Sequence, residues 1–198
     1  MPKLLAIIGK AGSGKTTVAK YLSQYKAYTI QSFANNLKKI VSESLGMSSN
    51  DLERIKNETM YFDTTSIDTN YISVCTDIDE KVISECLYKF EKVTPRQLLQ
   101  VVGTDIIRKC NPNWHIQQLN IESKSSKVCF DDTRFHNELK YIRENGGKVV
   151  HIQRDFGNTS DTHISENELN ADNADFIIVN DSSLSELFSK IDEITSRL

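Results

Sequence analysis

Short apolar runs, separated by longer mixed stretches, are the first recognisable pattern in the chain. The clearest runs are too short for typical helices, and most are rich in β-branched or aromatic residues. Such runs predict strands that are buried on both faces. The predicted strands are Leu4–Ile8, Val128–Phe130, Val149–Gln153 and Phe176–Val179, with a weaker one at Tyr28–Ser32.

Helices are predicted between these strands. Thr94 stands as an N-cap before Pro95, and Gln97 can complete a capping box, so a helix should begin there. The pair Gly146-Gly147 predicts a left-handed C-terminal cap. The predicted helices are Lys15–Gln24, Ala34–Leu45, Ser48–Lys56, Asp79–Phe90, Pro95–Lys109, Asn137–Asn145 and a last one from Ser183 to Arg197.

The alternation of strands and helices predicts a three-layer α/β/α fold with a central parallel sheet and right-handed crossovers. The stretch Gly46–Val93 interrupts the alternation, since it is rich in Ser, Thr, Asn and Asp, and Met60–Thr76 has no sustained period. A chain of 198 residues fits one domain. We therefore expect a single domain over residues 1–198, with an insertion at about 46–93 near the mouth of the active site rather than a second folding domain.

Composition narrows the class of protein. Apolar residues make up 38% and charged residues 26%, as in an ordinary globular protein, and the net charge of −3 argues against a nucleic-acid partner. No apolar stretch is long enough to cross a bilayer, and no signal peptide is recognisable. Cys75, Cys86, Cys110 and Cys129 lack zinc-site spacing, so free thiols in a reducing cytoplasm are expected.

The strongest chemical signal is a glycine-rich segment between the first strand and the first helix. It matches G-x-x-x-x-G-K-[ST] in full, a pattern whose backbone N–H groups cradle phosphates at a helix N-terminus. Lys15 should bridge the β- and γ-phosphates of ATP, and the Thr16 hydroxyl should join a magnesium shell. The predicted ATP-binding residues here are Gly9, Lys10, Ala11, Gly12, Ser13, Gly14, Lys15, Thr16 and Thr17.

The acidic end of the strand Val128–Phe130 is a second signal. A strand that ends in acid is where a second magnesium-shell carboxylate belongs. Because adjacent residues at a strand end point to opposite faces, only one of Asp131 and Asp132 can take that place. Arg134, two residues beyond Asp132, can bring its guanidinium to the same side as that carboxylate.

Four arginines stand at the ends of predicted elements: Arg96, Arg108, Arg134 and Arg154. Arginine offers a planar fork that matches phosphate oxygens, although any one of them could instead form a surface ion pair. Together they suit an acidic protein that handles two phosphate-bearing ligands. An acceptor that is itself a phosphate monoester needs no strong base, because its second pKa is near 6. Catalysis would then consist of positioning and charge neutralisation by Lys15, magnesium and arginines.

Several longer motifs resemble those of the viral deoxynucleoside monophosphate kinases. The resemblance covers most of the chain apart from roughly 46–93. It is carried by Phe33-Ala34-x-x-Leu37-Lys38, Thr94-x-Arg96-x-Leu98-Leu99-Gln100-x-x-Gly103-Thr104-Asp105-x-x-Arg108 with Trp114, Asp132-x-Arg134-Phe135-x-Asn137-Glu138, Gly146-Gly147, Arg154 and Asp161-x-His163-x-Ser165-Glu166.

The resemblance implies an adenylate-kinase-like P-loop fold and the reaction dNMP + ATP giving dNDP + ADP. It places Asp132 near magnesium, with Thr16, and implies catalytic roles for Lys15, Asp132, Arg134 and Arg154. A short lid would run from Arg154 to about Glu166 and include Asp161 and His163, and Asn180 would lie where such kinases contact adenine. The implied acceptor-binding residues are Phe33, Lys38, Arg96, Gln100, Thr104, Arg108, Trp114 and Arg134.

Some of these assignments have structural alternatives. Trp114 could belong to a core, Asn180 to a simple turn, and His163 to the polar surface of the lid. The phosphate loop is closer to that of general nucleotide kinases than to the family pattern, which often has Asp where Thr16 stands. His136 replaces a common proline.

The remaining functional alternatives are another P-loop small-molecule kinase, acting on phosphomevalonate or dephospho-coenzyme A, and a GTPase switch or binding module. A GTPase would be expected to carry Asn-Lys-x-Asp after a late strand, and Asn180-Asp181-Ser182-Ser183 is not that motif. The expected partners are small-molecule nucleotides, without nucleic acid or membrane. The resemblance also suggests a homodimer and, if the source is viral, the host cytoplasm.

Overall fold

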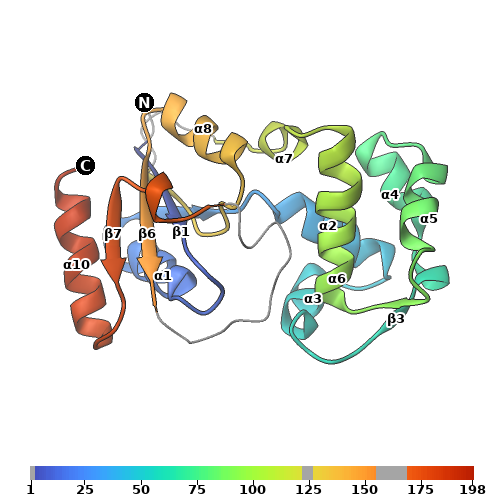
Figure 1. Cartoon of the computed structure of the whole chain (residues 1–198), viewed down its shortest axis with the longest axis horizontal. Helices are drawn as coiled ribbons and strands as arrows, with labels where there is room; N and C mark the ends of the chain where they lie inside the picture. The colour runs from blue at the N-terminus through green and yellow to red at the C-terminus, as the bar shows by residue number, and fades with distance from the viewer. Residues whose placement is uncertain (1–2, 122–126, 155–168) are drawn as a thin grey trace. The chain divides into compact units, whose positions relative to one another are not determined.

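The computed structural model describes residues 3–121, 127–154 and 169–198 (Figure 1). The chain divides into two compact units. The first, here called the sheet unit, contains the chain up to Phe33 together with Asn120–Leu198. The second, the helical unit, is Ala34–Leu119.

The sheet unit is built on a parallel sheet with the strand order β2-β5-β1-β6-β7. Every strand predicted from the apolar runs is present, with ends shifted by at most one residue. The strands are β1 Lys3–Ile8, β2 Tyr28–Gln31, β5 Lys127–Phe130, β6 Lys148–Gln153 and β7 Phe176–Val179. Since β1 is central and the chain leaves it toward one side first and the other later, ligands are expected at its carboxyl end.

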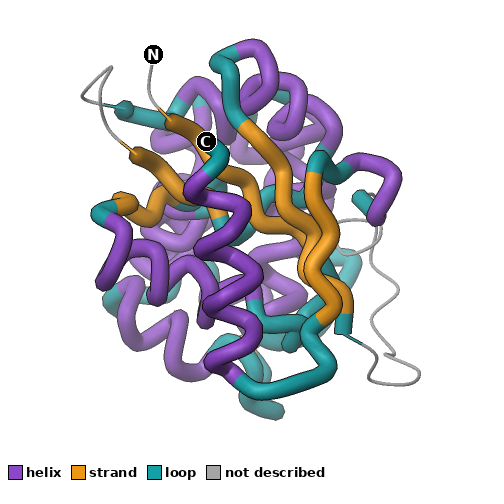
Figure 2. The backbone as a smooth tube through the Cα atoms, turned by 90° about the vertical axis from the view of Figure 1, so that its left-hand side faces the viewer, coloured by secondary structure: helices purple, strands orange, loops and turns teal. Residues whose placement is uncertain are grey.

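Helices cover both faces of this sheet (Figures 1 and 2). On one face, apolar residues of α1 (Lys15–Lys26) and α10 (Leu184–Ser196) pack with the strands in a single core cluster. α8 (His136–Glu144) covers the other face, and Gly146, just beyond its C-cap Asn145, is left-handed with φ 75°. A Cβ on the next residue, Gly147, would lie 2.8 Å from the Leu4 Cβ, so this helix end approaches the sheet closely. A one-turn 3-10 helix, η3 (Ala171–Asn173), precedes β7.

The helical unit has its own hydrophobic core. Residues of the predicted insertion at 46–93 share this core with residues that precede and follow them in the chain, and the compact unit as a whole is Ala34–Leu119. The placement of the insertion near the mouth of the active site stays a prediction. The elements of the helical unit are α2 Asn35–Ser44, α3 Ser49–Ile55, β3 Phe62–Asp63, η1 Thr64–Ser66, α4 Thr69–Thr76, α5 Glu80–Leu87, β4 Lys92–Val93, α6 Pro95–Gln100, η2 Val101–Arg108 and α7 Trp114–Gln117. β3 and β4 form a short antiparallel ribbon. Neither this ribbon nor α4 and α7 was predicted.

The helix predicted at Pro95–Lys109 is present but changes its winding partway. α6 begins with the predicted capping box of Thr94 and Gln97. From Val101 to Arg108 the chain continues as a π-helix, η2. Gly103 lies on η2 against α2, since a Cβ there would be 2.5 Å from the Leu37 Cδ2. No helix in the described part of the chain is long and apolar enough to cross a membrane.

Candidate active site

The phosphate loop connects β1 to α1 at the carboxyl edge of the sheet. Two of its glycines are required by geometry. Gly9 has φ 139°, and a Cβ there would lie 2.3 Å from the Ile152 carbonyl oxygen of β6. Gly14, the N-cap of α1, has φ 110°, and its Cβ would lie 2.8 Å from the Asn180 amide nitrogen. The loop is therefore held between neighbouring strand ends, with the N-terminus of α1 behind it.

The Lys15 ammonium is folded back over this loop. Its Nζ donates to the Gly9 carbonyl at 2.6 Å and to the Lys10 carbonyl at 2.8 Å. These contacts keep a full positive charge at the loop whose N–H groups and helix dipole favour anions. The Lys15 ammonium therefore lies at the loop that is predicted to bind phosphates.

The first of the two adjacent acids, Asp131, reaches the phosphate loop. Thr16 Oγ1 donates to Asp131 Oδ2 at 2.9 Å. The two carboxylates diverge as expected, and the one that contacts Thr16 is Asp131, not Asp132. The reason is the alternation of side chains at the end of β5, which turns the first acid toward α1.

Asp132 instead binds the end of β2. Its Oδ2 accepts a 2.5 Å hydrogen bond from the Ser32 hydroxyl, and its Oδ1 accepts from the Phe33 main-chain N–H at 3.1 Å. Phe33 is buried, with its ring stacked on Phe130 at a centroid distance of 4.7 Å. Asp132 and Phe33 therefore fix the ends of two strands to each other. Ser32 is not among the predicted site residues, although it directly precedes the motif that begins at Phe33.

Arg134 is held through its backbone by a buried carboxylate. Glu138 Oε2 accepts from the Arg134 N–H at 2.8 Å and from the Phe135 N–H at 3.1 Å. Glu138 is 2% exposed and lies in the first turn of α8. It was quoted in the resemblance but not assigned to the site, and its contacts give it a positioning role for Arg134.

Asn180 follows β7 and supports the phosphate loop through a hydrogen bond to its backbone. Its amide Nδ2 donates to the Ser13 carbonyl at 2.8 Å, and its own N–H donates to the Gln153 carbonyl at 2.8 Å. Asn180 is 8% exposed and Ser13 is fully buried. Asn180 thus supports the phosphate loop, and its contact with adenine stays a prediction.

Among the residues that the structure describes, four buried polar atoms of the sheet unit have no hydrogen-bond partner; one of them, Asp192 Oδ1, lies 3.0 Å from Lys26 Nζ in an ion pair, and the other three lie close to the phosphate loop or to the two acids. These three are Ser13 Oγ, Thr133 Oγ1 and His151 Nδ1. Ser13 belongs to the phosphate loop, Thr133 follows the two acids, and His151 pairs in register with Ile8, the residue before the loop. Burial, followed by the Lys15 charge, lowers the pKa of His151. The sequence offered no signal for Thr133 or His151.

Four of the predicted acceptor-binding residues recur at every fourth position of α6 and η2, and all four are half-buried: Arg96, Gln100, Thr104 and Arg108. In an ideal α-helix each step of four residues drifts by about 40°, so Arg96 and Arg108 would diverge by about 120°. A π-helix, with i→i+5 bonds and roughly 4.4 residues per turn, turns back by about 33° per step. One α step and two π steps leave these arginines within roughly 30° of each other. The change of winding thus keeps the row on one face of the helix.

The other predicted acceptor and lid residues differ in their placement. Lys38 lies half-buried on α2. Trp114 is 5% exposed within the core of the helical unit, so the core alternative describes its position better than a stacking role does. Arg154 is exposed directly after β6. Asp161, His163 and Glu166 lie outside the described residues.

Several known proteins are similar to this chain. The model of the deoxynucleotide monophosphate kinase family matches residues 51–191. A protein of Acanthamoeba polyphaga mimivirus, provisionally named deoxynucleotide monophosphate kinase, is 30% identical over 205 residues, which cover 95% of this chain and 93% of that protein. The deoxynucleotide monophosphate kinases of Escherichia phage RB69 and Enterobacteria phage T4 are 33% and 35% identical over 50% and 48% of this chain, and 43% of each is covered. Because the family model spans well over half of the chain and the mimivirus relative aligns with nearly all of it, the chain belongs to the deoxynucleotide monophosphate kinase family.

Proposed function

We propose that this protein transfers the γ-phosphoryl group of ATP to the 5′-phosphate of a deoxynucleoside monophosphate, giving dNDP and ADP. One observation carries the proposal. In a chain of this family, a complete phosphate loop brings the Lys15 ammonium and the Thr16–Asp131 pair to the carboxyl end of the central strand. These are the groups that hold a nucleoside triphosphate in P-loop kinases.

The triphosphate is assigned to the sheet unit. The loop amides and the N-terminus of α1 bind the β-phosphate, and Lys15 exchanges its two carbonyl contacts for β- and γ-phosphate oxygens. Because the amine is already beside the loop, this exchange needs only a side-chain movement. Charge that accumulates on the transferred group is then stabilised by a cation that is in place before the reaction.

Magnesium fits the oxygen donors beside the loop. Thr16 Oγ1 and the Asp131 carboxylate offer hard oxygen ligands, and magnesium typically uses one or two such groups with phosphates and waters. Among the described residues, no group of three or more His, Cys, Asp or Glu side chains could hold a metal, which suits a site completed by phosphates. When bound, magnesium would neutralise charge on the phosphates. We assign Asp131 to it in place of Asp132.

The acceptor phosphate is assigned to the helical unit. Arg96 and Arg108 share one face of α6 and η2 with Gln100 and Thr104, so guanidinium and neutral donors lie along one row. At neutral pH the second ionisation of a phosphate monoester, near pH 6, is largely complete. Its oxygen is then nucleophilic without a general base, which agrees with a site made of cations. Arg134 and Arg154 remain predicted contacts to phosphate.

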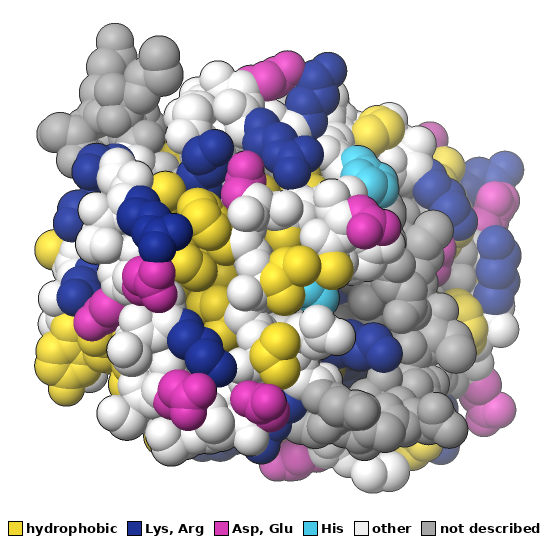
Figure 3. Space-filling view, turned by 60° about the vertical axis from the view of Figure 1, so that its left-hand side comes forward, with side chains coloured by type: hydrophobic (Ala, Val, Ile, Leu, Met, Phe, Trp, Pro, Cys, Tyr) yellow, Lys and Arg dark blue, Asp and Glu magenta, His cyan; other side chains and the backbone are white. Residues whose placement is uncertain are grey.

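We further propose that the ligands are free nucleotides rather than nucleic acid, in the cytoplasm of the cell in which the protein is made. On the face shown in Figure 3, Lys and Arg side chains are interspersed with Asp and Glu. A duplex-binding surface would be expected to concentrate basic residues. A homodimer is also proposed, and sedimentation of the purified protein tests it.

A panel of acceptors tests the proposal. ATP is combined with each common NMP and dNMP, and with phosphomevalonate and dephospho-coenzyme A, and products are separated by thin-layer chromatography. At least one dNMP should be converted to its diphosphate, and Lys15→Ala should lower that turnover by about a hundredfold or more. Conversion of phosphomevalonate or dephospho-coenzyme A in preference to every dNMP would refute the proposal.

A further inference from the structure

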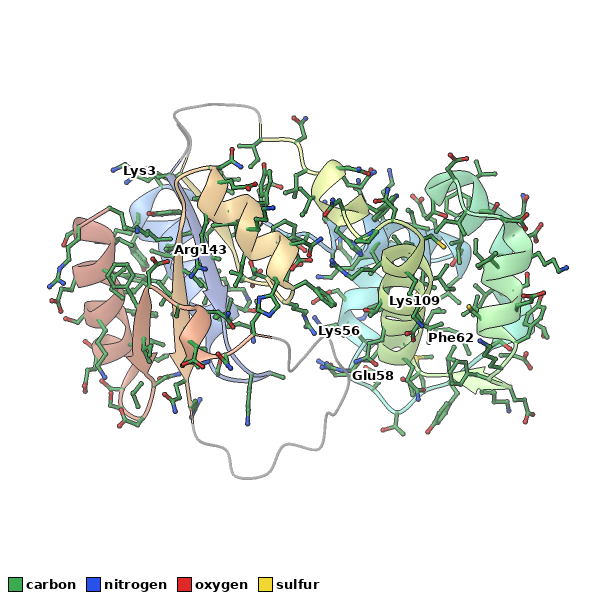
Figure 4. All side chains as sticks on the ribbon, turned by 45° about the horizontal axis from the view of Figure 1, so that its top comes forward. Lys3, Lys56, Glu58, Phe62, Lys109 and Arg143 are labelled. Atoms are coloured by element: carbon green, nitrogen blue, oxygen red, sulfur yellow. The ribbon has the colours of Figure 1, made fainter. Side chains whose placement is uncertain are left out.

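One glutamate in the helical unit binds two lysines at the same time. The Glu53 carboxylate, on α3, lies 3.2 Å from Lys38 Nζ of α2 through Oε2 and pairs with Lys56 Nζ through Oε1. The two lysine side chains are only 30% and 31% exposed. This set of three residues is called the Glu53 cluster. Figure 4 shows Lys56, labelled, at the end of α3.

The Glu53 cluster carries one more positive charge than negative. Burial alone would raise the pKa of Glu53, but its ion pairs with Lys56 and Lys38 outweigh burial and lower that pKa below its usual range. The carboxylate is therefore ionised at neutral pH. It can satisfy only part of the charge of two ammonium groups, and the remaining positive charge favours an anion.

The cluster adjoins the row of predicted acceptor-binding residues. Asn57, the residue after Lys56, accepts a long 3.5 Å hydrogen bond from Arg96 Nη1 through its side-chain oxygen. Lys38 is itself a predicted acceptor-binding residue. Lys56 is thus connected to Lys38 through Glu53, and its chain neighbour Asn57 contacts Arg96, although Lys56 itself belongs to the segment that the family motifs do not cover.

An ordinary structural role has to be weighed against this. Lys56 is the C-cap of α3, where a cation interacts favourably with the helix dipole. A surface ion pair contributes little to stability, typically below about 1 kcal/mol. Neither role explains why two half-buried lysines from different helices converge on one carboxylate beside an arginine.

We propose that Lys56 is a further residue that binds the 5′-phosphate of the acceptor nucleotide, beside Lys38 and Arg96, and that Glu53 is the counter-ion that holds the two ammonium groups until the phosphate arrives. A dianionic monoester fits two ammonium groups that are restrained by one carboxylate and accompanied by the Arg96 guanidinium. Binding moves the ammonium groups from carboxylate to phosphate oxygens, so their charges are never left unpaired. This inference rests on the proposed function and adds an unassigned residue to its acceptor site.

Steady-state kinetics of four variants test the inference, with the best dNMP acceptor and ATP. Lys56→Ala should raise the acceptor KM by about ten- to a hundredfold, as expected for loss of a charge-assisted hydrogen bond, and change the ATP KM by less than about twofold. Lys56→Arg should retain most of the affinity. Glu53→Gln should lower the acceptor KM, because the competing carboxylate is gone. Lys81→Ala is the matched control, since Lys81 also pairs with a glutamate in the helical unit but is 82% exposed.

The outcomes separate the inference from the proposed function. An acceptor KM for Lys56→Ala equal to that of Lys81→Ala, with or without a lower melting temperature, would reduce Lys56 to a structural cap and overturn the inference alone. A large rise in acceptor KM for Glu53→Gln would overturn the counter-ion role. If Lys56→Ala does not fold, Lys56→Gln provides the same measurement. Failure of the unaltered protein to phosphorylate any dNMP would refute both proposals.

Discussion

Replacing Asn180 with alanine distinguishes two roles that the sequence could not separate. An adenine contact would make Asn180 part of base recognition. The structure instead shows its amide donating to the buried Ser13 carbonyl at 2.8 Å, next to the space that a Gly14 side chain would need. Asn180→Ala removes that donor without adding volume. We expect the phosphate loop, rather than base selection, to suffer.

The size of the effect follows from the burial of the acceptor that is left behind. Ser13 is fully buried, so its carbonyl has little access to replacement water. A buried acceptor without its partner costs about 1–3 kcal/mol. If the loop relaxes to relieve this cost, it must be re-formed when a triphosphate binds, and the dissociation constant rises by roughly five- to 150-fold.

Calorimetry with two ligands measures this directly. The magnesium complexes of ATP and of inorganic tripolyphosphate are titrated into the unaltered protein and into Asn180→Ala. A loop support predicts the same factor of weakening for both ligands, because both use the loop. Asp181→Asn serves as a control, since the Asp181 side chain is 70% exposed and its carboxylate lies 4.0 Å from Lys190. Weakening of ATP binding alone, with tripolyphosphate unaffected, would refute the loop-support assignment and restore the adenine contact.

Three further predictions concern Asp131, Gly9 and His151 of the sheet unit. Asp131→Asn should raise the magnesium concentration needed for half-maximal activity by about tenfold, whereas Asp132→Asn should leave that concentration unchanged, as measured by magnesium titration at saturating ATP. Gly9→Ala should lower the free energy of unfolding in urea by more than about 2 kcal/mol, because its Cβ would collide with a strand carbonyl; Gly46→Ala, whose Cβ would meet nothing within 4 Å, should lose less. Since the pKa of His151 in the folded protein is below its ordinary value of 6.5, the unfolded chain binds more protons as the pH falls, so stability should decline below about pH 6.5 and decline less in His151→Gln.

The sheet and the phosphate loop were predictable because their signals are local. Each strand is a short apolar run, and several helix boundaries of the sheet unit are set by residues within one turn. The capping boundaries illustrate this, since Ser183 accepts from the Glu186 N–H at 3.3 Å and Gly146 adopts the left-handed conformation expected of it. Such features depend on neighbours in sequence and require no knowledge of the fold.

The helical unit was less predictable because tertiary contacts decide its structure. α4 contains several β-branched and polar residues without helical periodicity, yet it forms because Asp68 caps it and Ile72 is fully buried in the core. The winding of η2 is equally invisible in the sequence. Gln97 and Thr94 mark where that helix begins, but nothing in the chain marks Val101 as the residue where π-winding starts.

The choice between the two adjacent acids shows the same limit at the scale of one residue. The alternation of side chains along a strand predicts that the two acids point apart. Which of them faces the phosphate loop depends on the register of β5 with its two neighbouring strands. That register is fixed by the pairing of Phe130 with Ala6 of β1 and with Gln31 of β2. With β5 in this register, Asp132 meets Ser32 at the end of β2, and Asp131 is left for Thr16.

Residues that hold the backbone of the site are harder to recognise than residues that touch ligands, and Glu138 explains why. Its carboxylate accepts from two consecutive N–H groups, at Arg134 and Phe135, and it is almost completely buried. A glutamate in the first turn of a helix is common, and here no Ser or Thr N-cap accompanies it to complete the usual signature. Removing this carboxylate would take away an acceptor shared by the Arg134 and Phe135 N–H groups, of which the second is buried, at the point where the chain presents Arg134. The segment from Asp132 to Glu138 therefore acts as one structural unit. In it, Glu138 fixes the backbone at Arg134, the arginine that we assign to a substrate phosphate, without being assigned to the phosphate itself.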